Sequence, residues 1–309
     1  MTEITASMIK NLRESTGAGM MDCKKALEQN NGNFEEATDW LRKKGIAGAA
    51  KKAGRVASEG LVSISQSGNK AAIIELNSET DFVAKNEKFQ QLAKKISEYA
   101  LETDGDIEKL NNFVSPDSKK KVSETVTENI AVIGENINLR RSAALEVKEG
   151  VIGTYIHNAV ASNLGKIGVI VAVESTGDKG KLAELGKQLA MHIAAAKPEA
   201  LNVENVDAAS LEREKAIYAE QAKSSGKPAE IIEKMVEGRV RKYYEQVVLP
   251  EQLFIMDGKT KVSSIIEKTS KEIGAPVKIT GFVQFTLGEG IEKEENDFAS
   301  EVAAAAGTR

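Results

Sequence analysis

Apolar residues recur with the 3.6-residue period of amphipathic helices along the first part of the chain. Three such stretches lie between residues 5 and 44, separated by turn residues at 15–17 and 30–32. Asn33 precedes the third stretch, and Glu35 in its first turn favours a helix N-terminus there. We therefore expect a three-helix domain over residues 1–54. A linker at residues 47–58, partly helical, overlaps its end and leads to the next part of the chain.

The pattern then changes to short apolar runs bounded by turn residues, which are typical of buried strands. Two runs followed by a helix-periodic stretch form a unit that occurs twice. Its parts lie at residues 60–64, 71–76 and 89–99, and again at residues 150–155, 167–173 and 182–193. The repeat predicts an α+β fold with two duplicated lobes, at residues 55–141 and 142–285, each an antiparallel sheet covered by helices on one face.

Two further helical segments accompany the lobes. Residues 117–141 have a helical apolar period, and Gly134 is expected either to end that helix or to mark a close backbone approach to another part of the chain. Residues 206–247 are polar and Ala-rich, and their two helical stretches meet near Pro228. This second segment predicts a protruding helical hairpin inserted in the second lobe.

The end of the chain returns to the second lobe. Residues 253–256 and 277–287 are expected to be strands, because both are apolar runs beside turn residues. A last helix carrying Phe298, Val302 and Ala305 is expected within residues 286–309.

Composition narrows the class of protein. The 309 residues include 42 Lys and Arg against 46 Asp and Glu, a net charge of −4, which does not suggest a nucleic-acid surface. The basic excess at the N-terminal end instead favours a protein partner. No apolar run is long enough to span a membrane, and the N-terminus resembles neither a signal nor a transit peptide. We expect a soluble, cytoplasmic protein.

Residues able to perform chemistry are few. Cys23 is the only cysteine, which excludes an intramolecular disulfide and any Cys-cluster metal site. His192 lies in an apolar helical pattern and is expected to be structural, whereas His157 shares a strand face with Tyr155. No phosphate-binding Gly-Lys-Ser/Thr loop occurs. The sequence therefore predicts no enzyme, no metal and no cofactor.

The connection after residues 71–76 contains an apolar pair, Phe82 and Val83, preceded by Asp81. A structural interpretation places Phe82 under the loop as part of the core, and propensity alone favours this by roughly two to one. A functional interpretation makes Phe82 an exposed apolar wedge on a turn between strand and helix.

Several motifs decide between these interpretations. Residues 80–85 read Thr-Asp-Phe-Val-Ala-Lys, and residues 133–141 read Ile-Gly-Glu-Asn-Ile-Asn-Leu-Arg-Arg. Residues 16–27 and 288–293 also carry specific matches, and together these motifs resemble the elongation factor Ts family, the guanine-nucleotide exchange factors of elongation factor Tu. The resemblance covers nearly the whole chain. It implies a ubiquitin-associated (UBA)-like N-terminal bundle, a duplicated core, an inserted helical hairpin and a C-terminal helix module.

The resemblance also assigns roles to residues. It implies that Thr80, Asp81, Phe82 and Val83 contact the GTPase domain of elongation factor Tu and displace the Mg²⁺ ion that holds GDP. Further contacts with the same partner are implied for Met20, Met21, Ile133, Gly134 and His157. Both methionines lie on one helix, where adjacent residues cannot share a face, so at least one should point outward.

Two questions stay open at this point. The inserted hairpin could serve homodimerisation or partner contact. A non-catalytic adaptor that binds a protein through its UBA-like bundle is the alternative function, although an adaptor would not need the two lobes.

Overall fold

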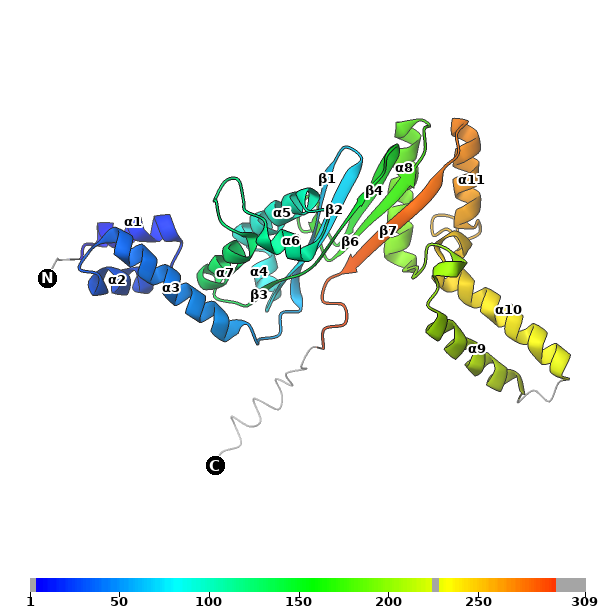
Figure 1. Ribbon diagram of the computed structural model, residues 1–309, viewed down its shortest axis with the longest axis horizontal. Coiled ribbons are helices and arrows are strands. Elements are labelled where there is room, and N and C mark those ends of the chain that lie inside the picture. The colour runs from blue at the N-terminus through cyan, green and yellow to red at the C-terminus, as the bar shows by residue number, and fades with distance from the viewer. Residues whose placement is uncertain (1–3, 224–227, 293–309) are drawn as a thin grey trace, which may run out of the picture.

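The computed structural model describes residues 4–223 and 228–292. A helical bundle lies at one end, two sheets with their helices form the middle, and a helical hairpin projects from the other end (Figure 1).

The N-terminal bundle consists of α1 (Ala6–Thr16), α2 (Met20–Gln29) and α3 (Phe34–Lys52). The Asn33 side chain accepts hydrogen bonds from two backbone N–H groups at the start of α3, as its position in the sequence predicts. Cys23 is fully buried in the small core of this bundle. The three helices are confirmed, and α3 takes in the first half of the expected linker.

The first sheet is antiparallel, with the strand order β3-β2-β1-β5. Its strands are β1 (Glu59–Ser67), β2 (Lys70–Ser78), β3 (Ile137–Glu146) and the short β5 (Leu164–Gly165). Its helices are α4 (Asp81–Ala84), α5 (Glu87–Glu102), α6 (Ile107–Asn112) and α7 (Val122–Ile133). Apolar residues of α5 and α7 pack with β1, β2 and β3 in one core cluster, so these helices cover the outer face of the sheet.

The second sheet is also antiparallel, with the order β4-β6-β7. Its strands are β4 (Gly150–His157), β6 (Ile167–Glu174) and β7 (Lys278–Thr286), and its outer face is covered by α8 (Lys179–Ala196) and α11 (Val262–Ile273). The projecting hairpin is made of α9 (Ala208–Lys223) and α10 (Ala229–Val247). Two short 3₁₀ turns, Val203–Asn205 and Leu249–Glu251, flank the hairpin. The expected hairpin is confirmed.

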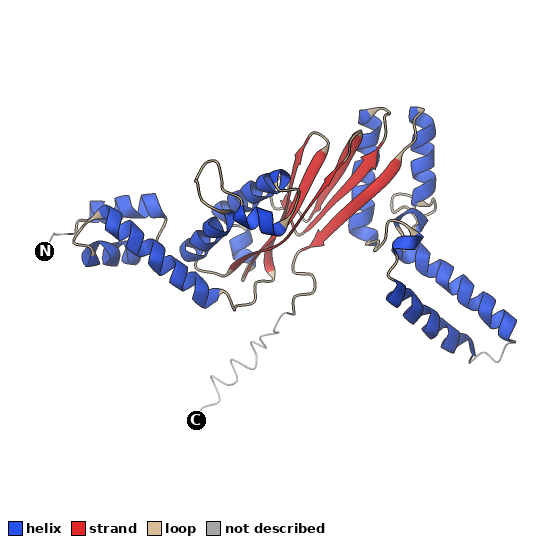
Figure 2. Ribbon diagram, viewed as in Figure 1, coloured by secondary structure: helices blue, strands red, loops and turns tan. Residues whose placement is uncertain are grey.

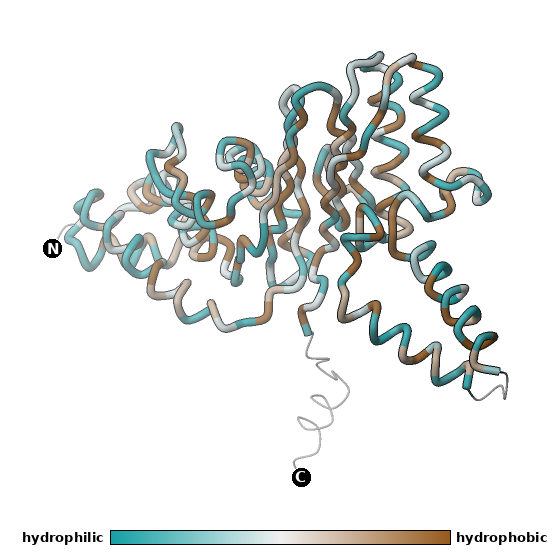
Figure 3. Tube along the Cα trace, turned by 45° about the vertical axis from the view of Figure 1, so that its right-hand side comes forward, coloured by the Kyte–Doolittle hydropathy of each residue, from teal (hydrophilic) through white to brown (hydrophobic). Residues whose placement is uncertain are grey.

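The inner faces of the two sheets pack against each other (Figure 2). A third core cluster combines Val62 and Ile73 of the first sheet with Ile170 and Phe285 of the second. Hydrophobic segments accordingly concentrate along the strands and the helices that cover them (Figure 3). The α+β class and the antiparallel sheets are confirmed, but the sheets share a core. The expected lobe boundary, between residues 141 and 142, falls inside β3.

Gly134 takes a left-handed conformation (φ 91°) and ends α7 at Ile133, which confirms the expected helix end. Two other expectations were wrong. The helical segment was expected to extend to residue 141, but residues 137–141 begin β3. Residues 253–256 were expected to be a strand, but they form only an isolated bridge between Leu253 and Lys261. The strand expected at residues 277–287 is confirmed as β7.

The helix expected around Phe298 lies outside the described residues. Within the described ranges, none of the helices is both long and apolar enough to cross a bilayer.

Candidate functional site

Phe82 lies on the single helical turn α4, between β2 and α5, and 76% of its surface is exposed. The next two residues, Val83 and Ala84, are buried in the core of the first sheet. Asn86 then caps α5 through its side-chain oxygen, which accepts the N–H of Lys88 at 2.9 Å. The neighbours of Phe82 therefore fix the turn while its ring faces solvent, which excludes the interpretation of Phe82 as a core residue.

Charged groups surround the exposed ring. Asp81 pairs with Lys85 at 2.9 Å, and the Lys85 ammonium lies 5.4 Å from the centroid of the Phe82 ring. The hydrogen bond from Lys85 holds the pKa of Asp81 below its ordinary value, so Asp81 is ionised at neutral pH. The turn thus presents an apolar ring beside a carboxylate and an ammonium group.

A second loop, between α7 and β3, holds the α4 turn in place. The backbone N–H and the hydroxyl of Thr80 donate to the Glu135 carboxylate at 2.9 and 2.7 Å. In return, the backbone N–H of Asn136 donates to Glu79 at 2.5 Å. These reciprocal bonds bring Gly134, which is exposed, next to the Phe82 turn.

The N-terminal bundle meets the same region. A Cβ atom on Gly17 would lie 3.5 Å from Val132, so the turn between α1 and α2 packs on the end of α7. Met20 and Met21 begin α2 directly after this turn, and their surfaces are 58% and 73% exposed. The expectation that at least one of them points outward is confirmed for both.

His157 comes to this region from the second sheet. It is exposed at the end of β4, and the Tyr155 hydroxyl lies 3.0 Å from its Nδ1 atom. The backbone N–H of Lys166 donates to the His157 carbonyl at 3.2 Å, and the charge of Lys166 also helps to lower the pKa of Asp81. The predicted site residues of the two lobes therefore lie at the same end of the sheet pair.

One exposed apolar group was missed by the sequence reasoning. Leu253, Ile255 and Met256 have exposed fractions of 54%, 40% and 48%, whereas Phe254 between them is buried. The signal in the sequence was the pair Asp257 and Gly258, which closes a turn and leaves too few residues for a strand.

A buried polar pair supports this loop from inside. The backbone N–H of Ile255 donates to His192 Nδ1 at 3.3 Å, so the ring proton lies on Nε2, 2.9 Å from the Gln252 side-chain oxygen. Burial lowers the pKa of His192, which keeps the ring neutral. The expected structural role of His192 is consistent with its complete burial.

None of the described residues form a group of three or more His, Cys, Asp or Glu side chains that could hold a metal ion. What these residues offer is a set of exposed groups: an apolar ring, two methionines, a glycine turn, a histidine and an apolar loop. This composition suits recognition of a protein.

Comparison with known proteins gives these exposed groups a context. The sequence profile of a family described as "Elongation factor TS" matches residues 79–289. The elongation factor Ts of Rhodospirillum centenum is 58% identical over 307 residues, which cover 99% of this chain and 100% of the relative. The elongation factor Ts of Brucella anthropi is 59% identical over 303 residues, which cover 98% of this chain and 99% of that relative. The elongation factor Ts of Paramagnetospirillum magneticum is 57% identical over 309 residues, which cover 100% of this chain and 99% of that relative.

Proposed function

The chain belongs to the elongation factor Ts family and is therefore a translation elongation factor, and from this premise we propose that it is the guanine-nucleotide exchange factor of elongation factor Tu. It binds elongation factor Tu·GDP in the cytoplasm and promotes the release of GDP, so that GTP can bind. The observation that supports this most directly is the exposed Phe82 ring on an anchored turn.

Exchange follows from linkage between two binding equilibria. A protein that binds the nucleotide-free GTPase more tightly than the GDP-bound form must weaken GDP binding by the same factor. GDP is held partly through a Mg²⁺ ion, whose octahedral coordination tolerates little displacement. We propose that Phe82 enters the GTPase domain as a wedge and shifts the elements that support this ion.

The four residues of the wedge turn divide the work. Phe82 and Asp81 are exposed enough to touch the partner, whereas Thr80 is tied to Glu135 and Val83 is buried. Thr80 and Val83 therefore keep the turn in a fixed conformation when Phe82 contacts the partner. Burying one Phe ring supplies about 1.5–3 kcal/mol, which is enough for a tenfold effect but not for the whole exchange rate.

Other contacts supply the rest. We propose that Ile133 and Gly134 extend the wedge surface, while Met20 and Met21 provide adaptable apolar contact from the bundle. His157 and the loop of Leu253, Ile255 and Met256 add contacts from the second sheet.

The test is release of a fluorescent GDP analogue from elongation factor Tu, with and without catalytic amounts of this protein. We expect strong acceleration of release and no GTP hydrolysis by the chain alone. If micromolar protein does not accelerate release, the exchange proposal is wrong and the adaptor alternative gains support.

A further inference from the structure

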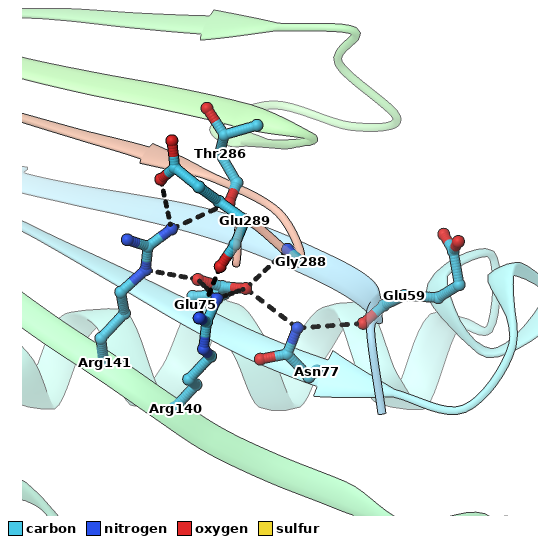
Figure 4. Close-up of polar contacts among 8 residues, drawn as sticks. All are labelled: Glu59, Glu75, Asn77, Arg140, Arg141, Thr286, Gly288 and Glu289. Atoms are coloured by element: carbon cyan, nitrogen blue, oxygen red, sulfur yellow. Dashed lines mark hydrogen bonds and ion pairs between the residues drawn. The ribbon is translucent and has the colours of Figure 1, made fainter. Parts of the chain in front are cut away.

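Glu75 is a fully buried carboxylate in the middle of the molecule. It lies on β2, and hydrogen-bond donors from three parts of the chain surround it (Figure 4). Arg140 and Arg141 on β3 contact it through Nη1 at 3.2 Å and Nε at 2.5 Å. The side chain of Asn77 donates to it at 2.9 Å, and the backbone N–H of Gly288 donates at 2.8 Å.

The Gly288 bond joins the two sheets, because Gly288 follows β7 of the second sheet while Glu75 belongs to the first. Both arginines extend this junction. Arg140 Nη2 donates to the Glu289 carbonyl at 2.6 Å, and Arg141 Nη2 donates to the Thr286 carbonyl at 2.8 Å. The turn after β7 is thus bound to β2 and β3 by hydrogen bonds that all depend on one cluster.

The turn fits only one way. Gly288 has a φ of 71°, and a Cβ atom there would lie 2.4 Å from the Ser58 carbonyl oxygen. The Arg141 guanidinium also covers the Phe285 ring at 4.3 Å from its centroid. Backbone and side-chain contacts therefore hold the turn after β7 in one position against the first sheet.

The cluster is charged under ordinary conditions. Burial raises the pKa of Glu75, but the hydrogen bonds from Gly288 and Asn77 and the charge of Arg141 outweigh it, and the pKa lies below its ordinary value. A buried ion pair of this kind contributes little stability compared with apolar packing. In some proteins a pair of this kind instead specifies one arrangement of the groups it joins.

The elements that this cluster joins carry the two halves of the candidate site. β2 leads from Glu75 into the Phe82 turn. Thr286, at the end of β7, pairs through Ile167 with His157 at the end of β4. We propose that Glu75, Arg140 and Arg141 are positioning residues of the exchange site, which fix the end of the second sheet relative to the Phe82 turn of the first.

The effect of this positioning on GDP release rests on the proposed exchange function. A wedge can displace part of its target only if the other contacts with that target are held at a fixed distance from the wedge. If the two sheet ends could shift, each half could still bind elongation factor Tu, but the two would no longer strain it together. Loss of the cluster should therefore lower the maximal rate of GDP release more than it weakens binding.

The experiment uses the full chain with Glu75→Gln, which keeps the side-chain volume but removes the charge that both arginines contact. Gly288→Ala disturbs the same junction from the turn after β7 and leaves all charges in place. It serves as the test variant if Glu75→Gln does not fold. Asp104→Asn is the matched control, because it removes an exposed ion pair with Lys70 at the other end of β2.

Two measurements are made on each variant. Spin labels are placed at Asn138→Cys, an exposed position on β3, and at Ala159→Cys, an exposed position two residues after β4, in a Cys23→Ala background. They report the distance between the two sheet ends. GDP-release kinetics, on the unlabelled proteins, separate kcat from KM. We expect one narrow distance distribution in the parent and control, a broad one in both test variants, and a kcat for release that falls about tenfold or more with little change in KM.

A narrow distribution in both test variants would overturn the positioning role, whatever the kinetics. A broad distribution with unchanged kcat would overturn the link to exchange. If the parent protein itself does not accelerate GDP release, the proposed function fails, and the distances alone then decide whether the cluster fixes the two ends.

Discussion

At the scale of single residues, Phe82 and Phe89 form a natural pair for testing the wedge. They lie seven positions apart, but Phe82 is 76% exposed and Phe89 is fully buried. Phe82→Ala leaves no cavity, so we expect little loss of stability and at least a tenfold slower GDP release. Phe89→Ala should cost about 3–5 kcal/mol, the usual loss for a buried Phe.

The unfolding midpoint and the GDP-release rate, measured on the same samples, check this pair. A large fall in the midpoint of Phe82→Ala with nearly normal release at low temperature would contradict the wedge.

His192 should make stability depend on pH. Its folded-state pKa lies below the ordinary value of 6.5, because burial disfavours the charged ring. The unfolded chain therefore binds the proton first as the pH falls, and stability that is complete above pH 6.5 is lost between 6.5 and the folded-state pKa. The loss is at most about 1.4 kcal/mol per pH unit.

Denaturant unfolding between pH 7.5 and 5 measures this slope, and His192→Gln should flatten it. A lower protection factor of the Ile255 amide at low pH, after correction for the slower intrinsic exchange, would accompany the loss, since a protonated Nδ1 cannot accept that hydrogen bond. An equal slope in both proteins would contradict this account.

The sequence predicted some of these residue environments and not others. The outward direction of at least one of Met20 and Met21 followed from helical periodicity, because adjacent residues of a helix cannot share a face. Periodicity could not place Phe82, because the burial of a loop aromatic depends on what the rest of the fold brings over it. Only the family motif favoured exposure, and the burial of Val83 and Ala84 supplies the physical reason.

At the scale of elements, α3 connects the bundle to the first sheet by packing on α7. A Cβ atom on Gly45 would lie only 2.9 Å from the Cβ atom of Ala131, whereas one on Gly48 would meet nothing within 4 Å. Gly45→Leu should push the helices apart without disturbing the bundle's own core. We expect the KM for elongation factor Tu to rise severalfold with an unchanged kcat.

Gly48→Leu is the control, because it makes the same change on the same helix where space is free. If both variants behave like the parent, docking of the bundle does not assist partner binding.

The errors at this scale have a common cause. Residues 137–141 and 253–256 are both short, and the apolar residues of a short segment are compatible with helix, strand or loop. Tertiary contacts determined the structure of each segment. Pairing with β2 places Ile137 and Leu139 in a strand. The burial of Phe254 against His192 turned the other run into a loop.

At the scale of the whole molecule, the shared core should make the sheets fold as one unit. Separate fragments 55–141 and 142–285 would each expose an inner sheet face, and the first would lose half of β3. We expect neither fragment to show a cooperative thermal transition by circular dichroism, while the sheets of the full chain melt together. A cooperative melt of either fragment would support independent lobes.

The repeat in the sequence predicted two sheets but not their packing. A clue was present in residues 71–74, which are four consecutive apolar side chains without alternation. Such a run indicates a strand buried on both faces, and a sheet covered on both faces needs a second layer beyond its helices. The second sheet is that layer.

Because the strands are antiparallel, the chain reverses at both ends of the sheet pair, yet the wedge and His157 lie at one end only. The turns at residues 68–69, 147–149 and 175–178 lie at the opposite end. That end should tolerate insertions and fused tags that the other would not. A fluorescent domain or purification tag placed there would leave the working end free, and length differences among relatives should gather at these turns.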